Sequence, residues 1–320
     1  MAVITLAATL SGCSAPSNSL ANDYASLKQV CEKFTTGANA DKISASGAFG
    51  TKPTVTFATP LSSNVLETKI LSEGSGPAFV GGQEVKFEYS AYNAATGKEF
   101  AASKYDGTDA VAQFFSTGQK LDFCHALSGA KEGSRVAILI PATMAHDGKG
   151  DATNGISPTD NLIFVIDLKK VYLPHAVGEK QPQQNGMPSV VLSTSGQPGV
   201  QVPKTAAPSE FKLVTLIKGH GPKVSIGDTV TLHYSGFIWA SGVQFDSSWT
   251  NNAPVQWQLT ETGFIKGFVR ALDGAVVGSQ IMAIIPPSEG YGDAEQGSIP
   301  AGSTLVFIID VLGDEKASTN

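Results

Sequence analysis

One acidic residue stands inside an aromatic stretch of the chain. The stretch is HYSGFIWASGVQFDSSW, residues 233–249, and Asp246 follows directly after Phe245. It predicts a strand, a turn at residues 240–242 and a returning strand, with most of the bulk supplied by Tyr234, Phe237, Trp239, Phe245 and Trp249. Two interpretations of the carboxylate follow. Asp246 either caps its own turn through a local hydrogen bond, or it is the polar group of an apolar site.

The other residues whose side chains could act in catalysis or bind a metal form no recognisable catalytic or metal-binding pattern. The five histidines have no metal-ligand spacing with the cysteines, and neither a GxSxG elbow nor a Walker A loop occurs. His146 could be taken for a catalytic base, but we interpret it as a solvated loop residue. We therefore expect no metal and no cofactor.

Composition indicates two domains rich in short strands and turns. The 320 residues are 42% hydrophobic and only 16% charged, with 34 glycines and 17 prolines. The net charge of −6 is spread without long runs of one sign. A nucleic-acid partner would need clustered Lys and Arg with aromatic residues between them, so we expect none.

The chain repeats itself. Residues 74–103 align without a gap on residues 219–248 at an offset of 145 (234 minus 89), with identical pairs that include Tyr89 and Tyr234. The same offset continues from residues 123–141 to residues 268–286. Upstream, KPTVTF at residue 52 matches MPSVVL at residue 187, which gives each copy a leading strand. Two copies at this long period indicate duplicated domains rather than a solenoid.

Each copy predicts a mostly antiparallel sheet with one short helix packed across it, which is an α+β arrangement. The helix is IKGFVRALDG at residues 265–274, where Ile265, Phe268 and Leu272 share a face and Gly274 ends it. We place the boundaries as follows: a signal and lipobox at 1–13, a tether and extension at 14–49, a first domain at 50–173, a linker at 174–187, a second domain at 188–314 and a tail at 315–320.

The start of the chain resembles the signal and lipobox of bacterial lipoproteins. An apolar run over residues 2–10 is followed by Leu10-Ser11-Gly12-Cys13, and a polar tether begins at Ser14. The resemblance implies lipidation of Cys13 and a membrane-anchored, extracytoplasmic protein of the bacterial cell envelope. No Lys or Arg precedes Lys28, so we expect the true start to lie upstream. The alternative is an ordinary apolar N-terminus.

Cys31 and Cys124 are the remaining cysteines. In an exported chain an even pair can form a disulfide. Two small buried thiols are the alternative, and the sequence leaves both open.

The second copy resembles the FKBP-type peptidyl-prolyl cis-trans isomerases. The residues that carry the resemblance are VTLHYSGF, GVQFDSSW, FIKGFVRALDGAVVGS, IPPSEGYG and IPAGSTLVFIIDVL, from residue 219 to residue 312. The resemblance implies two tandem domains, each a curved antiparallel sheet wrapped on one short helix, with an aromatic pocket that accepts proline. It also implies sensitivity to macrolide inhibitors.

Carried over position by position, the resemblance assigns a pocket. Its polar groups are Asp246 and Tyr291, which act on substrate together with Tyr234 and Phe245, and its apolar walls are Val255, Phe264, Ile265, Phe268 and Phe307. Plain core packing is the alternative for each apolar member. The sequence departs from the family at Phe268, where Trp is common, at Val255, which replaces an aromatic residue, and in the loop after Tyr291, which is about a residue shorter.

The first copy has lost part of this set. At the same offset Asp246 corresponds to Ala101, Tyr291 to His146 and Ile265 to Lys120, while Tyr89, Phe100 and Phe123 remain. We therefore expect the first domain to keep the fold with little or no isomerase activity.

The sequence thus predicts a lipid-anchored isomerase that speeds proline-limited folding of exported proteins, with the activity in the C-terminal domain. Its partners would be Xaa-Pro segments of unfolded or exported proteins. A holdase that captures such segments without turnover is the main alternative, and a purely structural envelope protein is a third.

Overall fold

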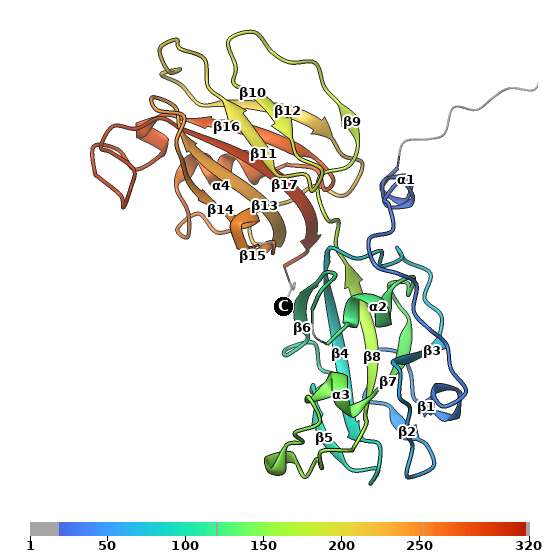
Figure 1. Cartoon of the computed structure of the whole chain (residues 1–320). Coiled ribbons are helices and arrows are strands. Elements are labelled where there is room, and N and C mark those ends of the chain that lie inside the picture. Colours follow the sequence, from blue (N-terminus) through green and yellow to red (C-terminus); the bar gives the residue numbers. More distant parts are fainter. Residues whose placement is uncertain (1–18, 120, 252, 318–320) are drawn as a thin grey trace, which may run out of the picture.

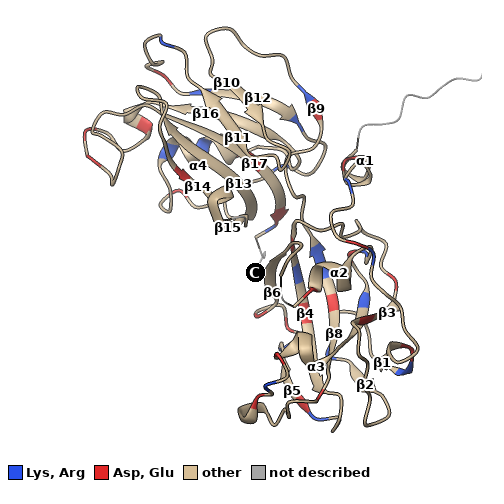
Figure 2. Cartoon of the chain, viewed as in Figure 1, with Lys and Arg blue, Asp and Glu red and all other residues tan. Residues whose placement is uncertain are grey.

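The computed structural model describes residues 19–119, 121–251 and 253–317, arranged in two lobes (Figure 1). Cys13, the predicted lipidation site, lies outside the described residues. Lys and Arg are interspersed with Asp and Glu over both lobes (Figure 2). Within the described ranges, no helix has the length and apolar character needed to cross a bilayer.

The C-terminal lobe is built on an antiparallel sheet. Its strands lie in the order β14-β13-β17-β16-β12-β9, and β15 also pairs with β13. The strand bounds are β9 Glu179–Lys180, β12 Lys212–Lys218, β13 Thr229–Ile238, β14 Gln244–Ser247, β15 Val255–Gln258, β16 Gln280–Ile285 and β17 Leu305–Glu315. Short 3-10 turns lie at η3 Ser248–Asn251 and η4 Pro287–Glu289.

The N-terminal lobe repeats this plan. Its strands lie in the order β3-β7-β8-β4-β5, with β6 paired to β4. The bounds are β3 Glu67–Ser72, β4 Gln83–Asn93, β5 Glu99–Ala102, β6 Val111–Phe115, β7 Arg135–Ile140 and β8 Leu162–Val171, with helices α2 Phe123–Leu127, α3 Ala142–Ala145 and η2 Ala152–Asn154. Two sheet-dominated domains with short helices confirm the predicted α+β repeat.

The helix of the C-terminal domain, α4, spans Lys266–Leu272, inside the predicted range. It packs closely on β16, because a Cβ placed on Gly267 would lie 2.4 Å from Ile285 Cγ2. Gly274 follows with a φ of +83°, a backbone conformation that residues other than glycine rarely adopt. The predicted stop is therefore confirmed.

A β-hairpin covers the other face of each sheet. β1 Ser44–Ser46 pairs with β2 Thr54–Thr56, after a 3-10 turn η1 at Ala40–Lys42, and β10 Ser189–Leu192 pairs with β11 Pro198–Gln201. Alternate residues of a strand point to opposite faces, so Ile281 and Ala283 join the helix-side core while Met282 and Ile284 join the hairpin-side core. The leading strand that the sequence predicts for each copy is thus half of a hairpin.

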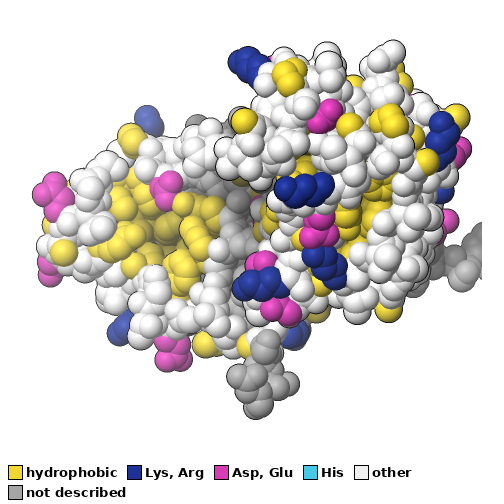
Figure 3. All heavy atoms as spheres, turned by 90° about the horizontal axis from the view of Figure 1, so that it is seen from below, with side chains coloured by type: hydrophobic (Ala, Val, Ile, Leu, Met, Phe, Trp, Pro, Cys, Tyr) yellow, Lys and Arg dark blue, Asp and Glu magenta, His cyan; other side chains and the backbone are white. Residues whose placement is uncertain are grey.

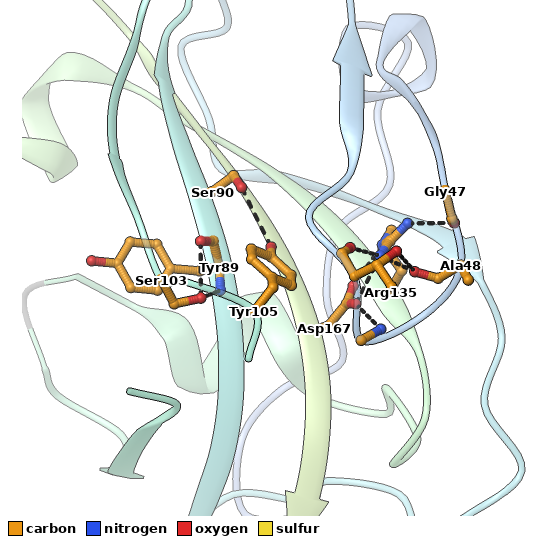
Figure 4. Close-up of polar contacts among 10 residues, drawn as sticks. Gly47, Ala48, Tyr89, Ser90, Ser103, Tyr105, Arg135 and Asp167 are labelled. Carbon is orange, nitrogen blue, oxygen red and sulfur yellow. Dashed lines mark hydrogen bonds and ion pairs between the residues drawn. The ribbon is translucent and has the colours of Figure 1, made fainter. Parts of the chain in front are cut away.

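A buried ion pair fixes the first hairpin (Figure 4). Arg135 Nε donates to Asp167 Oδ1 over 2.6 Å and Nη2 donates to Oδ2 over 2.8 Å, and both side chains are almost wholly buried. The same guanidinium donates to the carbonyl oxygens of Gly47, Ala48 and Thr51. The hairpin turn is therefore held by a charge pair whose remaining donors are satisfied by backbone oxygens.

Residues 19–31 form an arm that contacts both domains. The arm contains helix α1, Leu20–Ala25. The side chains of Leu20, Tyr24 and Leu27 pack against the C-terminal core. The Tyr24 hydroxyl donates to the Val171 carbonyl over 2.7 Å. The sequence predicts a polar tether and extension here; the described part is instead docked, because its apolar side chains recur at helical spacing.

Cys31 and Cys124 are joined in a disulfide. The bond ties the end of the arm to α2 of the N-terminal domain. At the other end, Asp23 accepts a hydrogen bond of 3.0 Å from His220 of the C-terminal domain. The arm is thus attached to both domains by side chains far apart in the sequence.

The two domains also meet directly at Glu315. Its carboxylate accepts from Lys86 over 2.6 Å and from the Tyr172 hydroxyl. Beyond Tyr172, the predicted linker contacts the C-terminal domain, since Val177 donates to Gly278 and β9 pairs with β12. Residues 174–180 therefore lie along that domain.

Replacement of Arg135 by Leu should destabilise the N-terminal domain by about 3–5 kcal/mol, because it leaves the Asp167 carboxylate buried without its partner. Urea denaturation followed by circular dichroism measures the change. Lys52→Gln is the control, since Lys52 forms an exposed pair with Glu99 and should change stability by less than about 1 kcal/mol. Equal effects of the two substitutions would contradict the assigned role of the buried pair.

Stability should also depend on Glu84 at the domain joint. Burial raises the pKa of Glu84 to about 7, and the nearby Glu315 carboxylate adds to the rise. A carboxyl with a raised pKa binds more protons in the folded chain, so its contribution to stability falls as pH rises from about 4 to about 7.

The Glu84→Gln variant should therefore be more stable than the parent at pH 8 and should lose less stability between pH 4.5 and 8. Urea denaturation at both pH values measures this, with the exposed Glu261→Gln as control. A decline as steep as that of the parent would refute the assignment.

Candidate functional site

Six aromatic side chains gather on the helix side of the C-terminal sheet. They come from β13, β14, β15, β17, α4 and the loop before α4: Tyr234, Phe245, Trp257, Phe307, Phe268 and Phe264. Figure 3 shows hydrophobic side chains gathered in a hollow on this lobe, on the left of the view. The strand pairing β14-β13-β17 places residues from distant parts of the chain on one face.

Phe268 is the floor of this cluster. It is 3% exposed, and its ring centroid lies 5.2 Å from Phe307, 5.5 Å from Phe264 and 6.5 Å from Tyr234. The contacts with Phe307 and Tyr234 are edge-on, an arrangement that aromatic quadrupoles favour. The residue that replaces the family's common Trp therefore keeps the same place at the base of the rings.

The walls are partly exposed, as a ligand site requires. Phe245, Val255, Phe264 and Ile265 are half-buried against the core. Phe245 lies over the backbone of β13, since a Cβ on Gly236 would come within 2.5 Å of its ring. Glycine at that position leaves room for the end of the ring against the strand.

Asp246 and Tyr234 form the polar part of the site. The Tyr234 hydroxyl donates to Asp246 Oδ2 over 2.5 Å, and Ser247 N–H donates to Oδ1 over 2.8 Å. Burial raises the pKa of Tyr234 well above its ordinary value, and the hydrogen bond to Asp246 raises it further. Tyr234 therefore remains a neutral donor. The local hydrogen bond to Ser247 satisfies the turn-cap interpretation, while the bond to Tyr234 places the carboxylate beside the rings.

Tyr291 lies at the exposed rim. It follows η4, is 36% exposed, and interacts electrostatically with Tyr234. The loop that carries it is tied to α4 by the ion pair of Arg270 Nη1 with Glu289 Oε1 at 2.8 Å. Every residue that the sequence assigns to the pocket thus belongs to the cluster or its rim.

Trp257 is the member that sequence reasoning missed. Its ring lies 5.2 Å from both Tyr234 and Phe264 and 6.1 Å from Phe268. Val255 and Trp257 are two apart on β15 and both pack on the core. The alternation of this short strand was the available signal.

The corresponding face of the N-terminal domain keeps rings but no carboxylate. The ring centroid of Phe164 lies 6.1 Å from Tyr89, 6.3 Å from Phe100 and 5.5 Å from Phe123. Ala101 on β5 stands where Asp246 stands on β14. This domain therefore has an apolar surface without the polar pair.

His146 is bound within its own loop. Its Nδ1 accepts from Gly150 N–H over 2.9 Å, which leaves Nε2–H to donate to the Asp160 carbonyl over 2.9 Å. Both ring nitrogens are used, so the imidazole holds the loop rather than acting as a base. Among the described residues, no cluster of His, Cys, Asp and Glu could hold a metal ion.

Comparisons with known proteins identify the same two segments. A family model described as FKBP-type peptidyl-prolyl cis-trans isomerase matches residues 76–169 and 221–312. A Streptomyces anulatus FK506-binding protein is 35% identical over 118 residues, which is 36% of this chain and 95% of that protein. A probable FK506-binding protein from Corynebacterium glutamicum is 34% identical over 116 residues, covering 36% of this chain and 97% of that one.

Among solved structures, the three FKBP domains of wheat FKBP73 align with 18% identity and a TM-score of 0.34, covering 78% of this chain and 94% of that one.

Proposed function

The chain belongs to the FKBP-type peptidyl-prolyl cis-trans isomerase family, and on this premise we propose that catalysis takes place in the aromatic cluster of the C-terminal domain. The single observation that carries the proposal is the Tyr234–Asp246 hydrogen bond beside six packed rings. The N-terminal domain has Ala101 in place of the carboxylate. We therefore assign turnover to the C-terminal copy alone.

The reaction needs neither a nucleophile nor a base. Rotation about an Xaa-Pro bond has a barrier of about 18–20 kcal/mol because it breaks amide resonance. The twisted amide has lost this conjugation, so its carbonyl is less polar and is better tolerated by apolar walls than the planar amide is. The rings therefore favour the transition state over the ground state.

The polar groups orient the substrate. The proline ring would rest on Phe268 between Phe245 and Phe307. Tyr291, exposed at the rim, would donate its hydroxyl to a substrate carbonyl. Asp246, held by Tyr234, would stabilise the polarised carbonyl carbon of the rotating amide.

A binding module without turnover is the second candidate. It is favoured by the N-terminal domain, where Tyr89, Phe100, Phe123 and Phe164 form an apolar surface without the polar pair. Such a surface would capture Pro-containing segments and pass them to the C-terminal site. If neither domain catalyses isomerisation, the same rings would bind Pro-containing segments without turnover, and the protein would be a holdase.

The clients and location are also proposals. We propose that the protein is exported, anchored through a lipid on Cys13, and acts on Xaa-Pro bonds of exported proteins. The Cys31–Cys124 disulfide supports an oxidising compartment, because such bonds persist outside the cytosol. Macrolide inhibitors would occupy the same rings, in keeping with the names of the FK506-binding relatives.

Asp246→Asn and Tyr234→Phe should each lower kcat/KM for an Xaa-Pro peptide by roughly tenfold or more, because the first removes the negative charge and the second removes the hydroxyl that orients the carboxylate. A protease-coupled or NMR exchange assay on the full chain measures the rate. Tyr89→Phe is the matched control in the N-terminal domain and should leave the rate unchanged, and so should the exposed Asp273→Asn.

If the parent chain gives no acceleration, the holdase interpretation replaces the enzymatic one. If Tyr89→Phe and Tyr234→Phe lower the rate equally, the proposed division of labour between the domains is wrong.

The anchor has its own test. When the protein is expressed from its native gene, the mature chain should begin at Cys13 with a lipid attached, and it should fractionate with membranes. Cys13→Ser should release it into the soluble fraction. Mass spectrometry of the mature N-terminus measures the modification. An unmodified Cys13 would contradict the anchoring proposal without affecting the enzymatic one.

A further inference from the structure

A cavity of about 580 Å³ lies where the arm, the connector after β8 and both domains meet. Its wall includes Phe114 of the N-terminal domain, His233 and Trp249 of the C-terminal domain, and four residues of the arm: Ser26, Leu27, Lys28 and Val30. The turn between β10 and β11 closes one side, where Gly196 packs against His175 and Trp249. None of the six rings of the aromatic cluster lines it, so it is a separate site.

His233 is a buried polar group in this wall. It is 3% exposed, its ring stacks on Trp249 at a centroid distance of 3.8 Å, and its Nδ1 lies 2.8 Å from Ser248 Oγ. Burial lowers the pKa of His233 to about 3, so the ring is neutral. The Ser248 hydroxyl lies 2.8 Å from Nδ1 and 3.4 Å from the Tyr234 carbonyl oxygen, and we assign its hydrogen to the closer acceptor, which leaves the ring proton on Nε2.

That Nε2–H makes no hydrogen bond within the part of the chain that the structure describes. Among the described residues, the fully buried side-chain atoms without a hydrogen-bond partner belong to Glu88 and Asp314, so Nε2 is open to the cavity that His233 lines. A polar group in such a place gains free energy from a hydrogen-bond partner. Because His233 lines the cavity, an acceptor group on a bound ligand would supply that partner.

The rest of the wall defines the ligand's charge and shape. Lys28 is the one charged side chain among the described residues that line the cavity, and no Asp or Glu lines it. The apolar lining comes from Leu27, Val30, Phe114, Pro174, Val177 and Trp249. The wall also includes His175, whose Nδ1–H donates to the Ala176 carbonyl over 2.9 Å and is therefore not available to a ligand. The Lys28 cation and the His233 N–H donor suit a carboxylate, while the apolar lining suits a hydrocarbon body. The volume falls in the range of ordinary small-molecule sites.

We propose that this cavity binds a carboxylate carried on a short apolar chain, with the anion between Lys28 and His233. Two sources share that chemistry: a free fatty carboxylate, and the C-terminal carboxylate of a hydrophobic peptide. In either case the ligand contacts the arm and both domains at once, independently of the aromatic pocket.

Isothermal titration calorimetry on the full chain tests the proposal with octanoate as the first probe. Octanoate should bind saturably at one site, whereas octylamine should not bind and octanol should bind at least about tenfold more weakly, because only the carboxylate pairs with the cation and the N–H donor. N-acetyl-leucyl-leucine and its C-terminal amide form the second arm. Tighter binding of octanoate indicates the fatty source, and tighter binding of the free-acid peptide indicates the peptide source.

Variants on the exposed arm localise the site without disturbing the core. Lys28→Gln should weaken octanoate binding about tenfold through loss of the charge, and Lys33→Gln, an exposed lysine of the same chain segment outside the wall, should not. Val30→Trp should block the cavity, whereas Val65→Trp should leave binding intact. Val30 and Val65 are matched in exposure, at 53% and 57%.

The proposal is overturned if neither octanoate nor the free-acid peptide binds saturably. Equal affinities for octanoate and octanol would overturn it as well, and so would octanoate binding that survives both Lys28→Gln and Val30→Trp.

Discussion

The central strands of each sheet are buried on both faces, and the rest of the molecule follows from that constraint. β13 and β17 are buried on both sides along nearly their whole length, so the sheet is covered on both faces. In both domains a hairpin covers one face and a short helix the other. α4 has seven residues, about 10 Å of helix, which is too short to cover its whole face. The uncovered part is lined by the rings of the aromatic cluster.

The two domains share one frame but differ in their polar groups, since Asp246 of the C-terminal domain is replaced by Ala101 in the N-terminal domain. The rings that support the core persist in both copies, because removing one would open a cavity at a cost of several kcal/mol. Asp246 is exposed, and its carboxylate is not part of the hydrophobic core. Its replacement by Ala101 therefore leaves the sheet intact. Under the proposed assignment, the duplicated chain keeps the fold in both copies and the active site in one.

The two domains also differ in the buried polar side chains that lie under the hairpins. The N-terminal domain has the Arg135–Asp167 ion pair, whereas the C-terminal domain has Gln280 donating to Asp310 over 2.7 Å. Asp310 also accepts from Ala176 N–H over 2.8 Å, and burial raises its pKa to about 6. The same place in the fold thus binds a hairpin turn in one domain and the interdomain connector in the other. The disulfide and the Glu315 contacts also belong to this joint, and the cavity lies where the arm and both domains meet.

The pocket rings around Asp246 were assigned by the resemblance to the FKBP-type family. The residues by themselves determined the repeat, the α+β class, the position of α4 and its stop at Gly274. These features are local: periodicity, turn residues and an ungapped register are written in neighbouring positions. Tertiary structure alone decided that Trp257 joins the rings, because β15 reaches them through its pairing with β13. It also decided that Cys31 bonds with Cys124, 93 residues away, and that the arm docks on both domains. Contacts of this kind depend on which surfaces remain after the sheets have formed, and no local pattern encodes that.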